Sequence, residues 1–230
     1  MRNGPGRGSA KSERALGDQS RRRPFDTPPG ASLIAHRGQG NARMKPAYVH
    51  LRVANIDARE LISRATFDAL WKLRPKEAQK IRIAGKPISI PRRQQAYERD
   101  YRFSGQESVA QSAPPVLRPF LAWGRQNVNA RLNGLLVNWY DAEFGEYIGA
   151  HHDSITGLAA GSPIVTISLG AQRVFRLREN GGKPSCDILV SNGTVLILPW
   201  RMNRRWTHEV LRRASDTGHR ISVTLRAFAD

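Results

Sequence analysis

The chain has 230 residues, 37 of them Lys or Arg and 19 Asp or Glu, which gives a formal net charge of +18 at pH 7. That length predicts one domain with appendages, and the charge favours a polyanionic partner, nucleic acid first and an anionic membrane surface second. The sequence has no apolar run near the roughly 20 residues that cross a bilayer, no signal-peptide pattern and a single cysteine, Cys186, which argues against a membrane-spanning, secreted or disulfide-stabilised protein.

The first 45 residues are rich in Gly, Pro, Ser and Arg and show little apolar periodicity. This composition predicts that residues 1–45 form a basic arm that is mostly disordered. We interpret its Arg21-Arg22-Arg23 cluster either as a phosphate-binding element or as part of a solvated tail. The folded domain is therefore expected at residues 46–230, with helices in residues 46–130 and a β-rich part in residues 131–230.

The first part of this domain is predicted to mix helix and strand. Residues 48–53 predict a short strand, and residues 81–90 predict a strand or hairpin. Between them, apolar residues recur at helical spacing over residues 56–73, and a proline follows as a stop signal. A second helix is predicted over residues 114–126, because Pro114-Pro115 suits a helix start and the apolar residues that follow supply a buried side.

From residue 132 onward the pattern is that of a β protein. Short apolar runs recur, and clusters of Gly, Asn and Pro separate them. Regularly spaced short strands of this kind predict a sandwich or a barrel. The expected strands lie within residues 135–140, 164–169, 174–177, 188–190, 194–198 and 221–228.

A metal-binding pattern lies within this β-rich part. His151 and Asp153 are two residues apart, so on a β-strand their side chains share one face while His152 points away. A second imidazole completes a set of two histidines and one carboxylate, and both His208 and His219 are available. Such a facial triad binds Fe(II) and leaves open positions for a cosubstrate and O2.

The last predicted strand carries two arginines on one face. Arg220 and Arg226 are separated by an even number of positions, so they share a face, while the other face is apolar, with Ile221, Val223 and Leu225. Guanidinium groups bind carboxylates through paired, charge-assisted hydrogen bonds. The pattern therefore predicts a dicarboxylate site, with an exposed basic face as the alternative.

Two further motifs frame these residues: Asn138-Trp139-Tyr140 precedes the H-x-D sequence, and Trp206-Thr207-His208 precedes the arginine strand. The order of the four motifs resembles the AlkB family of Fe(II)/2-oxoglutarate dioxygenases. The resemblance extends over about residues 87–228 and also includes Ile90-Pro91-Arg92-Arg93-Gln94, Tyr101-Arg102-Phe103-Ser104-Gly105, Gly161-Ser162-Pro163-Ile164 and Ser168-Leu169-Gly170-Ala171.

The resemblance implies an enzyme with an α+β, mainly β fold. Its core would be a double-stranded β-helix (jelly-roll) at residues 131–230, with N-terminal helices and a β-ribbon nucleotide-recognition region at residues 46–130. The implied cofactors are Fe(II), 2-oxoglutarate as cosubstrate and O2. The implied reaction removes N-alkyl lesions of the 1-methyladenine and 3-methylcytosine type from DNA, with RNA also open, and releases formaldehyde, succinate and CO2.

The resemblance also assigns the residues of the site. His151, Asp153 and His208 would bind iron and form the catalytic centre, since His208 matches the family's distal histidine. Phe103 would stack on the base, opposite the ring of His151. The residues implied to bind 2-oxoglutarate are Asn138, Tyr140, Arg220, Ser222 and Arg226, with Arg220 on the distal carboxylate and Arg226 near the iron. The other expected substrate contacts are Tyr97 and Tyr101 as polar contacts, and Arg92, Arg93, Arg173 and Arg176 as phosphate contacts.

Two departures from the family pattern bear on the ligands. Ser222 stands where many relatives carry Asn, and Ser154-Ile155-Thr156 follow the H-x-D sequence where relatives that repair DNA often carry acidic residues. Two alternatives therefore stay open: the same oxygenase chemistry on a protein side chain or small molecule, and a noncatalytic nucleic-acid-binding relative. The basic charge argues against the first, and the intact triad argues against the second.

The remaining expectations concern the oligomeric state, the partners and the cellular location of the protein. We expect a monomer that binds nucleic acid and no membrane, in the cytoplasm or nucleoid of a bacterium or in the nucleus of a eukaryote. Cys186 is expected to be an incidental loop or strand residue that binds no metal.

Overall fold

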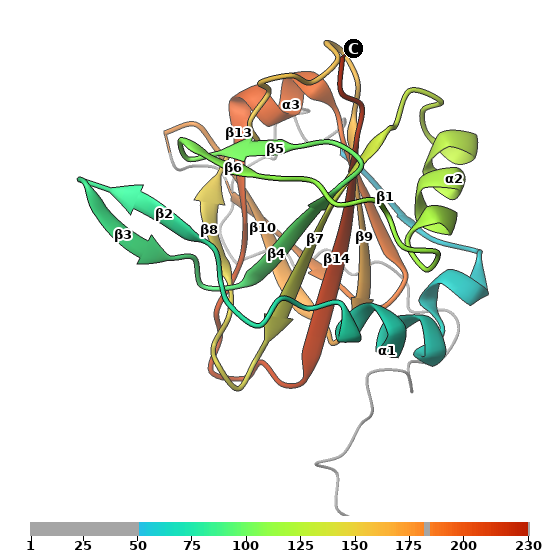
Figure 1. The fold of residues 1–230 in the computed structure, drawn as a ribbon, viewed down its shortest axis with the longest axis horizontal. Coiled ribbons are helices and arrows are strands. Elements are labelled where there is room, and N and C mark those ends of the chain that lie inside the picture. Colours follow the sequence, from blue (N-terminus) through green and yellow to red (C-terminus); the bar gives the residue numbers. More distant parts are fainter. Residues whose placement is uncertain (1–50, 182–184, 230) are drawn as a thin grey trace, which may run out of the picture.

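The computed structural model describes residues 51–181 and 185–229, so the predicted arm at residues 1–45 lies outside the described residues. Two antiparallel sheets form the body of the molecule (Figure 1). The larger sheet has the strand order β1 (Arg52–Asn55), β12 (Thr194–Leu198), β9 (Ile164–Gly170), β14 (His219–Arg226), β7 (Gly134–Asp141) and β4 (Arg93–Tyr97). The smaller sheet has the order β11 (Ser185–Val190), β10 (Arg173–Glu179), β13 (Trp206–Val210) and β8 (Ile148–His151).

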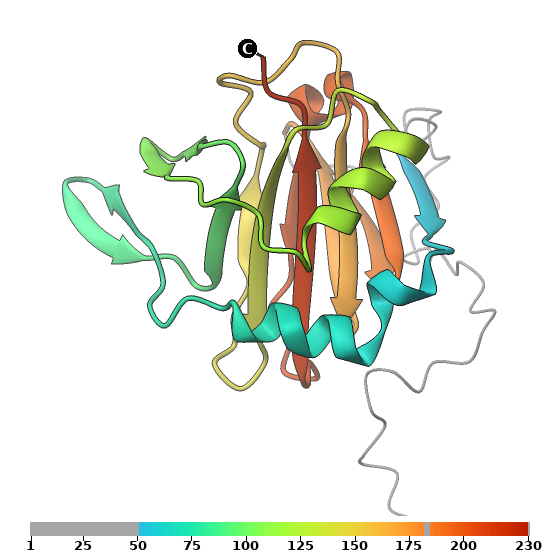
Figure 2. The ribbon, with the colours of Figure 1, turned by 45° about the vertical axis from the view of Figure 1, so that its right-hand side comes forward.

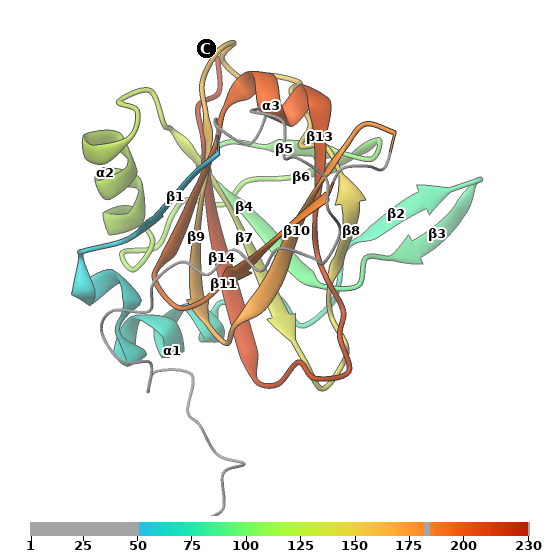
Figure 3. The same cartoon turned by 180° about the vertical axis from the view of Figure 1, so that it is seen from behind.

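The two sheets wrap around a common interior and form a double-stranded β-helix, as the views from the front and from behind show (Figures 1 and 3). From β7 onward, successive strands alternate between the sheets, except that β10 and β11 form a hairpin in the smaller one. The predicted mainly β, jelly-roll fold is thus confirmed. In this fold the central strands β14 and β7 line the interior from one side, and β13 and β8 line it from the other.

The central strands of the larger sheet are covered on both faces, so all eight residues of β7 are buried. On β14, Ile221, Val223 and Leu225 belong to the main apolar cluster, which includes residues of two helices on the outer face. Residues at the alternate positions, among them Arg220 and Arg226, line the space between the sheets. The alternation predicted for this strand therefore separates an apolar outer face from a polar inner one.

Helices α1 (Arg64–Lys72) and α2 (Arg118–Asn127) cover the outer face of the larger sheet (Figure 2). Ser63 caps α1, because its Oγ accepts the backbone N–H of Thr66 at 3.1 Å. The indole of Trp139 on β7 donates a hydrogen bond of 2.9 Å to the carbonyl of Leu70, which ties this helix to the sheet. None of the helices in the described part of the chain is long and apolar enough to cross a membrane.

Two small hairpins project from the two sheets (Figures 1 and 2). They are β2 (Lys80–Ile83) with β3 (Lys86–Ser89), and β5 (Tyr101–Phe103) with β6 (Gln106–Ser108). Each turns on two residues with positive φ, namely Ala84-Gly85 with 48° and 79° and Ser104-Gly105 with 45° and 70°. Positive φ at both central residues is the signature of the type I′ turn, whose twist matches that of the paired strands.

The predicted elements of the first half need correction. The helix expected over residues 56–73 is a short 3₁₀ helix, Arg59–Ile62, followed by α1, because Ser63 is extended and starts a new helix. The expected strand at residues 48–53 is β1, Arg52–Asn55, and residues 48–50 lie outside the described residues. The second helix begins at Arg118, four residues later than expected, since Pro114-Pro115 lies in the turn that leads to it.

Candidate active site

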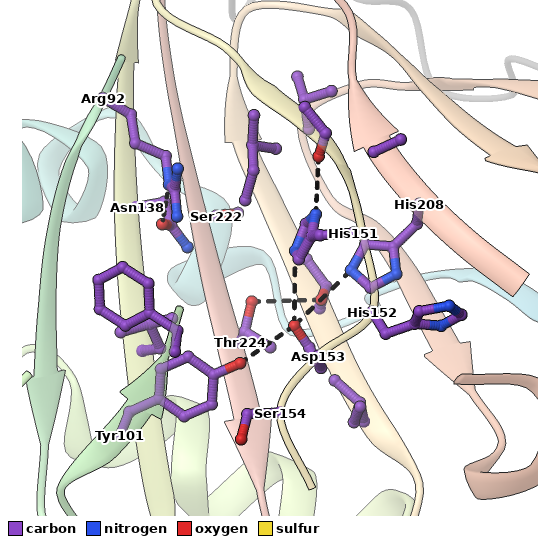
Figure 4. Close-up of a pocket in the computed structure, with 18 of the residues that line it drawn as sticks. Arg92, Tyr101, Asn138, His151, His152, Asp153, Ser154, His208, Ser222 and Thr224 are labelled. Carbon is purple, nitrogen blue, oxygen red and sulfur yellow. Dashed lines mark hydrogen bonds and ion pairs between the residues drawn. The ribbon is translucent and has the colours of Figure 1, made fainter. Parts of the chain in front are cut away.

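A cavity of about 790 Å³ lies between the two sheets, and Tyr101, Phe103 and Ser104 of the β5–β6 hairpin form part of its wall. Its wall includes residues from β14, β7 and β9 on one side and from β8, β10 and β13 on the other. Figure 4 shows Arg92, Tyr101 and Asn138 on one side of this cavity and His151 and His208 on the other. The sequence-predicted triad, both predicted arginines and Phe103 all line it.

His151, Asp153 and His208 come together at one wall of the cavity, with one potential ligand atom from each within 4.8 Å of the others. Strands β8 and β13 place the two histidines directly opposite each other in the ladder. Asp153 lies beyond the end of β8, and its Oδ1 is 3.7 Å from the Nε2 atoms of both His151 and His208. Two imidazole nitrogens and one carboxylate oxygen are the ligands of an Fe(II) facial triad, so the donor set fits that metal.

The hydrogen bonds and the burial of the triad residues determine which of their atoms can bind a metal. The Nδ1 of His151 lies 2.8 Å from the carbonyl of Gly149. A carbonyl only accepts hydrogen bonds, so Nδ1 carries the proton and Nε2 keeps the lone pair that binds a metal. For His208, burial and the neighbouring His151 lower the pKa below its ordinary value. This imidazole is therefore neutral at pH 7 and has no proton to lose before it binds.

Asp153 is a fully buried carboxylate with partners on both oxygens. Arg226 donates to Oδ2 at 2.7 Å, and the hydroxyl of Tyr101 donates to Oδ1 at 3.3 Å. Burial alone would raise the pKa of Asp153, but the charge of Arg226 outweighs it and, with the contribution of the two triad histidines, holds the pKa well below the ordinary value. Asp153 is thus an anion at pH 7, and Arg226 fixes its orientation.

The other available histidine, His219, lies outside the triad. Its ring stacks on Trp71 with centroids 4.2 Å apart, and its Nε2 is 3.4 Å from Oδ2 of Asp141. This follows from the strand alternation, because His219 and Arg220 are adjacent on β14 and only Arg220 lines the cavity.

Arg220 is a buried cation with hydrogen-bonding capacity to spare. It is 1% exposed, its Nη2 donates to Ser168 at 3.0 Å, and its guanidinium lies 5.0 Å from the ring centroid of Tyr140. Its Nε and Nη1 have no hydrogen-bond partner, and within the described part of the chain no carboxylate pairs with it. Burial therefore lowers the pKa of Arg220. A buried guanidinium with two spare donors, at the wall of a cavity, fits the carboxylate of a bound acid.

Polar side chains of the larger sheet continue from Arg220 along the cavity wall. Asn138, Ser222 and Thr224 are all buried and line it. The guanidinium of Arg92 donates to Oδ1 of Asn138 at 2.9 Å and to Oε1 of Gln94 at 2.7 Å. Because Arg92 occupies the amide oxygen, the amide nitrogen is the group that Asn138 offers to a ligand.

Several predicted substrate contacts need correction. Tyr97 is 3% exposed and belongs to the main apolar cluster, so it does not contact substrate. Arg173 is 2% exposed and donates to the carbonyls of Gln172, Thr217 and Gly218, so it is structural. Arg176 follows Phe175, which lines the cavity, so it points to the outer face of the smaller sheet, where it pairs with Asp187.

The two arginines of the Ile90–Gln94 segment also differ from their predicted phosphate-contact role. Arg92 is buried inside the cavity, and Arg93, which does not line it, pairs with Glu146. Tyr101 and Phe103 do line the cavity, and their rings stack with centroids 6.1 Å apart. Two further features are not marked by any sequence pattern: the pair of hydroxyls at Thr166 and Thr224, 3.2 Å apart, and the side chain of Asn203, which contacts the backbone of Asp153.

Comparison with known proteins identifies relatives of this chain. The family model described as the 2OG-Fe(II) oxygenase superfamily matches residues 57–226. The DNA oxidative demethylase ALKBH2 of Homo sapiens is 29% identical over 209 residues, which cover 82% of this chain and 80% of that protein. The Bos taurus protein of the same name is 30% identical over 75% of this chain and 68% of its own length. The alpha-ketoglutarate-dependent dioxygenase alkB homolog 3 of Homo sapiens is 29% identical over 121 residues.

Proposed function

Because the chain belongs to the 2OG-Fe(II) oxygenase superfamily and is an AlkB homologue, we propose that it removes N-alkyl groups of the 1-methyladenine and 3-methylcytosine type from DNA. The name of the human and bovine relatives, DNA oxidative demethylase, supports this choice of substrate. The formal net charge of +18 supports it as well, because a strongly basic protein binds the phosphate backbone. RNA is the second substrate to test.

In this proposal His151, Asp153 and His208 hold the iron, and the wall around Arg220 holds 2-oxoglutarate. The spare Nε and Nη1 donors of Arg220 bind the distal carboxylate. Asn138 and Tyr140 add hydrogen bonds from the same wall, since both line the cavity. With iron and 2-oxoglutarate bound, O2 hydroxylates the N-methyl carbon while 2-oxoglutarate is converted to succinate and CO2, and the hydroxymethyl group leaves as formaldehyde.

Side chains of the protein orient the metal ligands and stabilise the charge of the Asp153 carboxylate. Arg226 and Tyr101 hold the carboxylate of Asp153 from its two oxygens. Arg226 also lies 4.3 Å from the ring centroid of Tyr101, which links the metal-binding wall to the β5 hairpin. Asp153 and His208 are buried, and an electrostatic contact is stronger at a buried site than in solvent.

The observation that carries the proposal for the substrate is the aromatic pair on β5. Tyr101 and Phe103 alternate with Arg102, so both rings face the cavity and Arg102 faces solvent. The two ring planes differ by 12°. A base that is taken out of the stack needs a flat apolar surface to lie on, and the rings of Tyr101 and Phe103 in the cavity wall offer one. Figure 4 shows Tyr101 across the cavity from the triad histidines.

We expect Phe103→Ala to weaken the use of methylated oligonucleotides. Base stacking on an aromatic side chain contributes about 1–3 kcal/mol, so the KM for a 1-methyladenine oligonucleotide should rise roughly five- to 150-fold. The turnover of 2-oxoglutarate without oligonucleotide should stay near that of the wild type, because Phe103 is not one of the potential metal ligands. Steady-state kinetics with both assays measures the two effects.

Phe144→Ala is the matched control, because this ring is 69% exposed in the turn that follows β7 and does not line the cavity. Its KM should equal that of the wild type. If Phe103→Ala leaves the KM for the oligonucleotide unchanged, the aromatic pair does not hold the base.

A further inference from the structure

The side chain of Asn203 contacts the backbone of Asp153 with both of its polar groups. The backbone N–H of Asp153 donates to Oδ1 of Asn203 at 3.0 Å, and Nδ2 of Asn203 donates to the carbonyl of Asp153 at 3.0 Å. Asn203 is 1% exposed and lies on α3 (Trp200–Arg205). The side-chain amide of Asn203 thus forms hydrogen bonds with the backbone of Asp153 in the way that a neighbouring strand would.

Asp153 needs such a partner because it lies outside the β ladder. Strand β8 ends at His151, and the pairing of β8 with β13 ends there too. Asp153 is 6% exposed, so neither of its backbone polar groups can rely on water. A buried N–H or carbonyl without a partner costs free energy, and one side chain here satisfies both groups.

Asn203 also holds the residue before Asp153. Nδ1 of His152 lies 2.5 Å from the backbone carbonyl of Asn203, so that the ring nitrogen donates and the carbonyl accepts. Figure 4 shows the ring of His152 turned away from the carboxylate of Asp153. The segment that carries the carboxylate is therefore held to α3 at three points.

Asn203 links the segment that carries Asp153 to the segment that carries His208. Helix α3 leads directly into β13, which carries His208. The bonds of Asn203 reach back 50 positions to Asp153. The distance between the carboxylate of Asp153 and Nε2 of His208, 3.7 Å, thus depends on how firmly the two segments are joined.

We propose that Asn203 is a positioning residue for the metal centre, which sets the place of the Asp153 carboxylate relative to His208 through its two bonds to the Asp153 backbone. It does not contact the metal or the substrate. The inference rests on the geometry of the triad and is independent of the nucleic-acid substrate proposed above, so its test uses metal binding alone.

The test compares Asn203→Ala with the wild type in the binding of Co(II), measured by calorimetry and by the visible spectrum of the bound ion, without cosubstrate or oligonucleotide. Changes to groups that orient metal ligands weaken metal binding by roughly ten- to a hundredfold, and we expect a loss of that size with an altered Co(II) spectrum. The melting temperature of the metal-free protein is measured in parallel.

Asn133→Ala is the matched control. Its amide makes the same pair of bonds to one backbone, accepting the N–H of Phe228 at 2.7 Å and donating to the carbonyl of Phe228 at 3.0 Å. This variant should lose thermal stability but bind Co(II) as the wild type does. Equal Co(II) affinities for Asn203→Ala and Asn133→Ala would overturn the proposal and leave Asn203 with a structural role only. If Asn203→Ala does not fold, Asn203→Gln against Asn133→Gln decides the question in the same way.

Discussion

Replacement of His208 by Ala is expected to abolish iron-dependent turnover of 2-oxoglutarate while the domain stays folded. His208 supplies one of three ligand atoms, and the two that remain cannot form a facial triad. Even changes to groups that only orient metal ligands cost roughly ten- to a hundredfold, so the loss of a ligand should exceed about a hundredfold. Succinate formation measures the turnover, and circular dichroism measures the fold.

The domain should tolerate this change because His208 makes no hydrogen bond through Nδ1, which is buried without a partner. His219→Ala is the control, since that ring stacks on Trp71 away from the cavity. Retention of turnover in His208→Ala, together with its loss in His219→Ala, would show that the assignment of the third ligand is wrong.

A change of Arg220 to Lys is expected to raise the 2-oxoglutarate requirement steeply. The lysine keeps a positive charge but replaces the planar guanidinium, whose Nε and Nη1 are the spare donors, with a single ammonium group. A hydrogen bond to a charged group contributes about 1.5–3 kcal/mol, so the KM for 2-oxoglutarate should rise on the order of ten- to a hundredfold. Titration of 2-oxoglutarate at a fixed oligonucleotide concentration measures it.

Arg176→Lys makes the same substitution on the outer face of the smaller sheet, where the arginine pairs with Asp187. This control should keep the KM of the wild type. An unchanged KM in Arg220→Lys would remove Arg220 from the cosubstrate site, whereas a rise in both variants would point to a general loss of folded protein.

The orientation of the two arginines on β14 could be predicted from the sequence alone. Strand alternation depends only on local geometry, and β14 lies at the centre of a sheet with both faces covered, so Arg220 and Arg226 face the cavity as predicted. Arg220 keeps two donors without a partner, as a dicarboxylate site needs, whereas Arg226 already donates to Asp153, so the cosubstrate site stays a prediction.

The side chains of His151 and Asp153 do lie close together, but not because both residues belong to one strand. The prediction placed His151 and Asp153 on one strand, but β8 ends at His151. The two side chains converge because the bonds to Asn203 hold the segment after the strand. A contact between residues 50 positions apart leaves no local pattern, so single-sequence reasoning could not find it.

The wrong substrate contacts share another cause. Tyr97, Arg173 and Arg176 were placed by residue type and by motif, and neither shows which face of a strand meets the cavity. The face of β10 becomes known only when its partners in the smaller sheet are known, because the register with β13 puts Leu177 opposite His208. The short strand β13 was missed because a few residues carry too little periodicity.

The measurement that tests the central claim most directly is mass spectrometry of methylated oligonucleotides after reaction. The 230-residue chain is loaded with Fe(II) and 2-oxoglutarate without oxygen and is then exposed to O2 with DNA and RNA strands that carry 1-methyladenine or 3-methylcytosine. We expect at least one DNA strand to lose its methyl group, with one formaldehyde released for each methyl group lost and at least as much succinate formed, and we expect His208→Ala to leave every strand unchanged. Succinate formation at the same rate with and without oligonucleotide, and no change in the mass of any strand, would contradict the central claim.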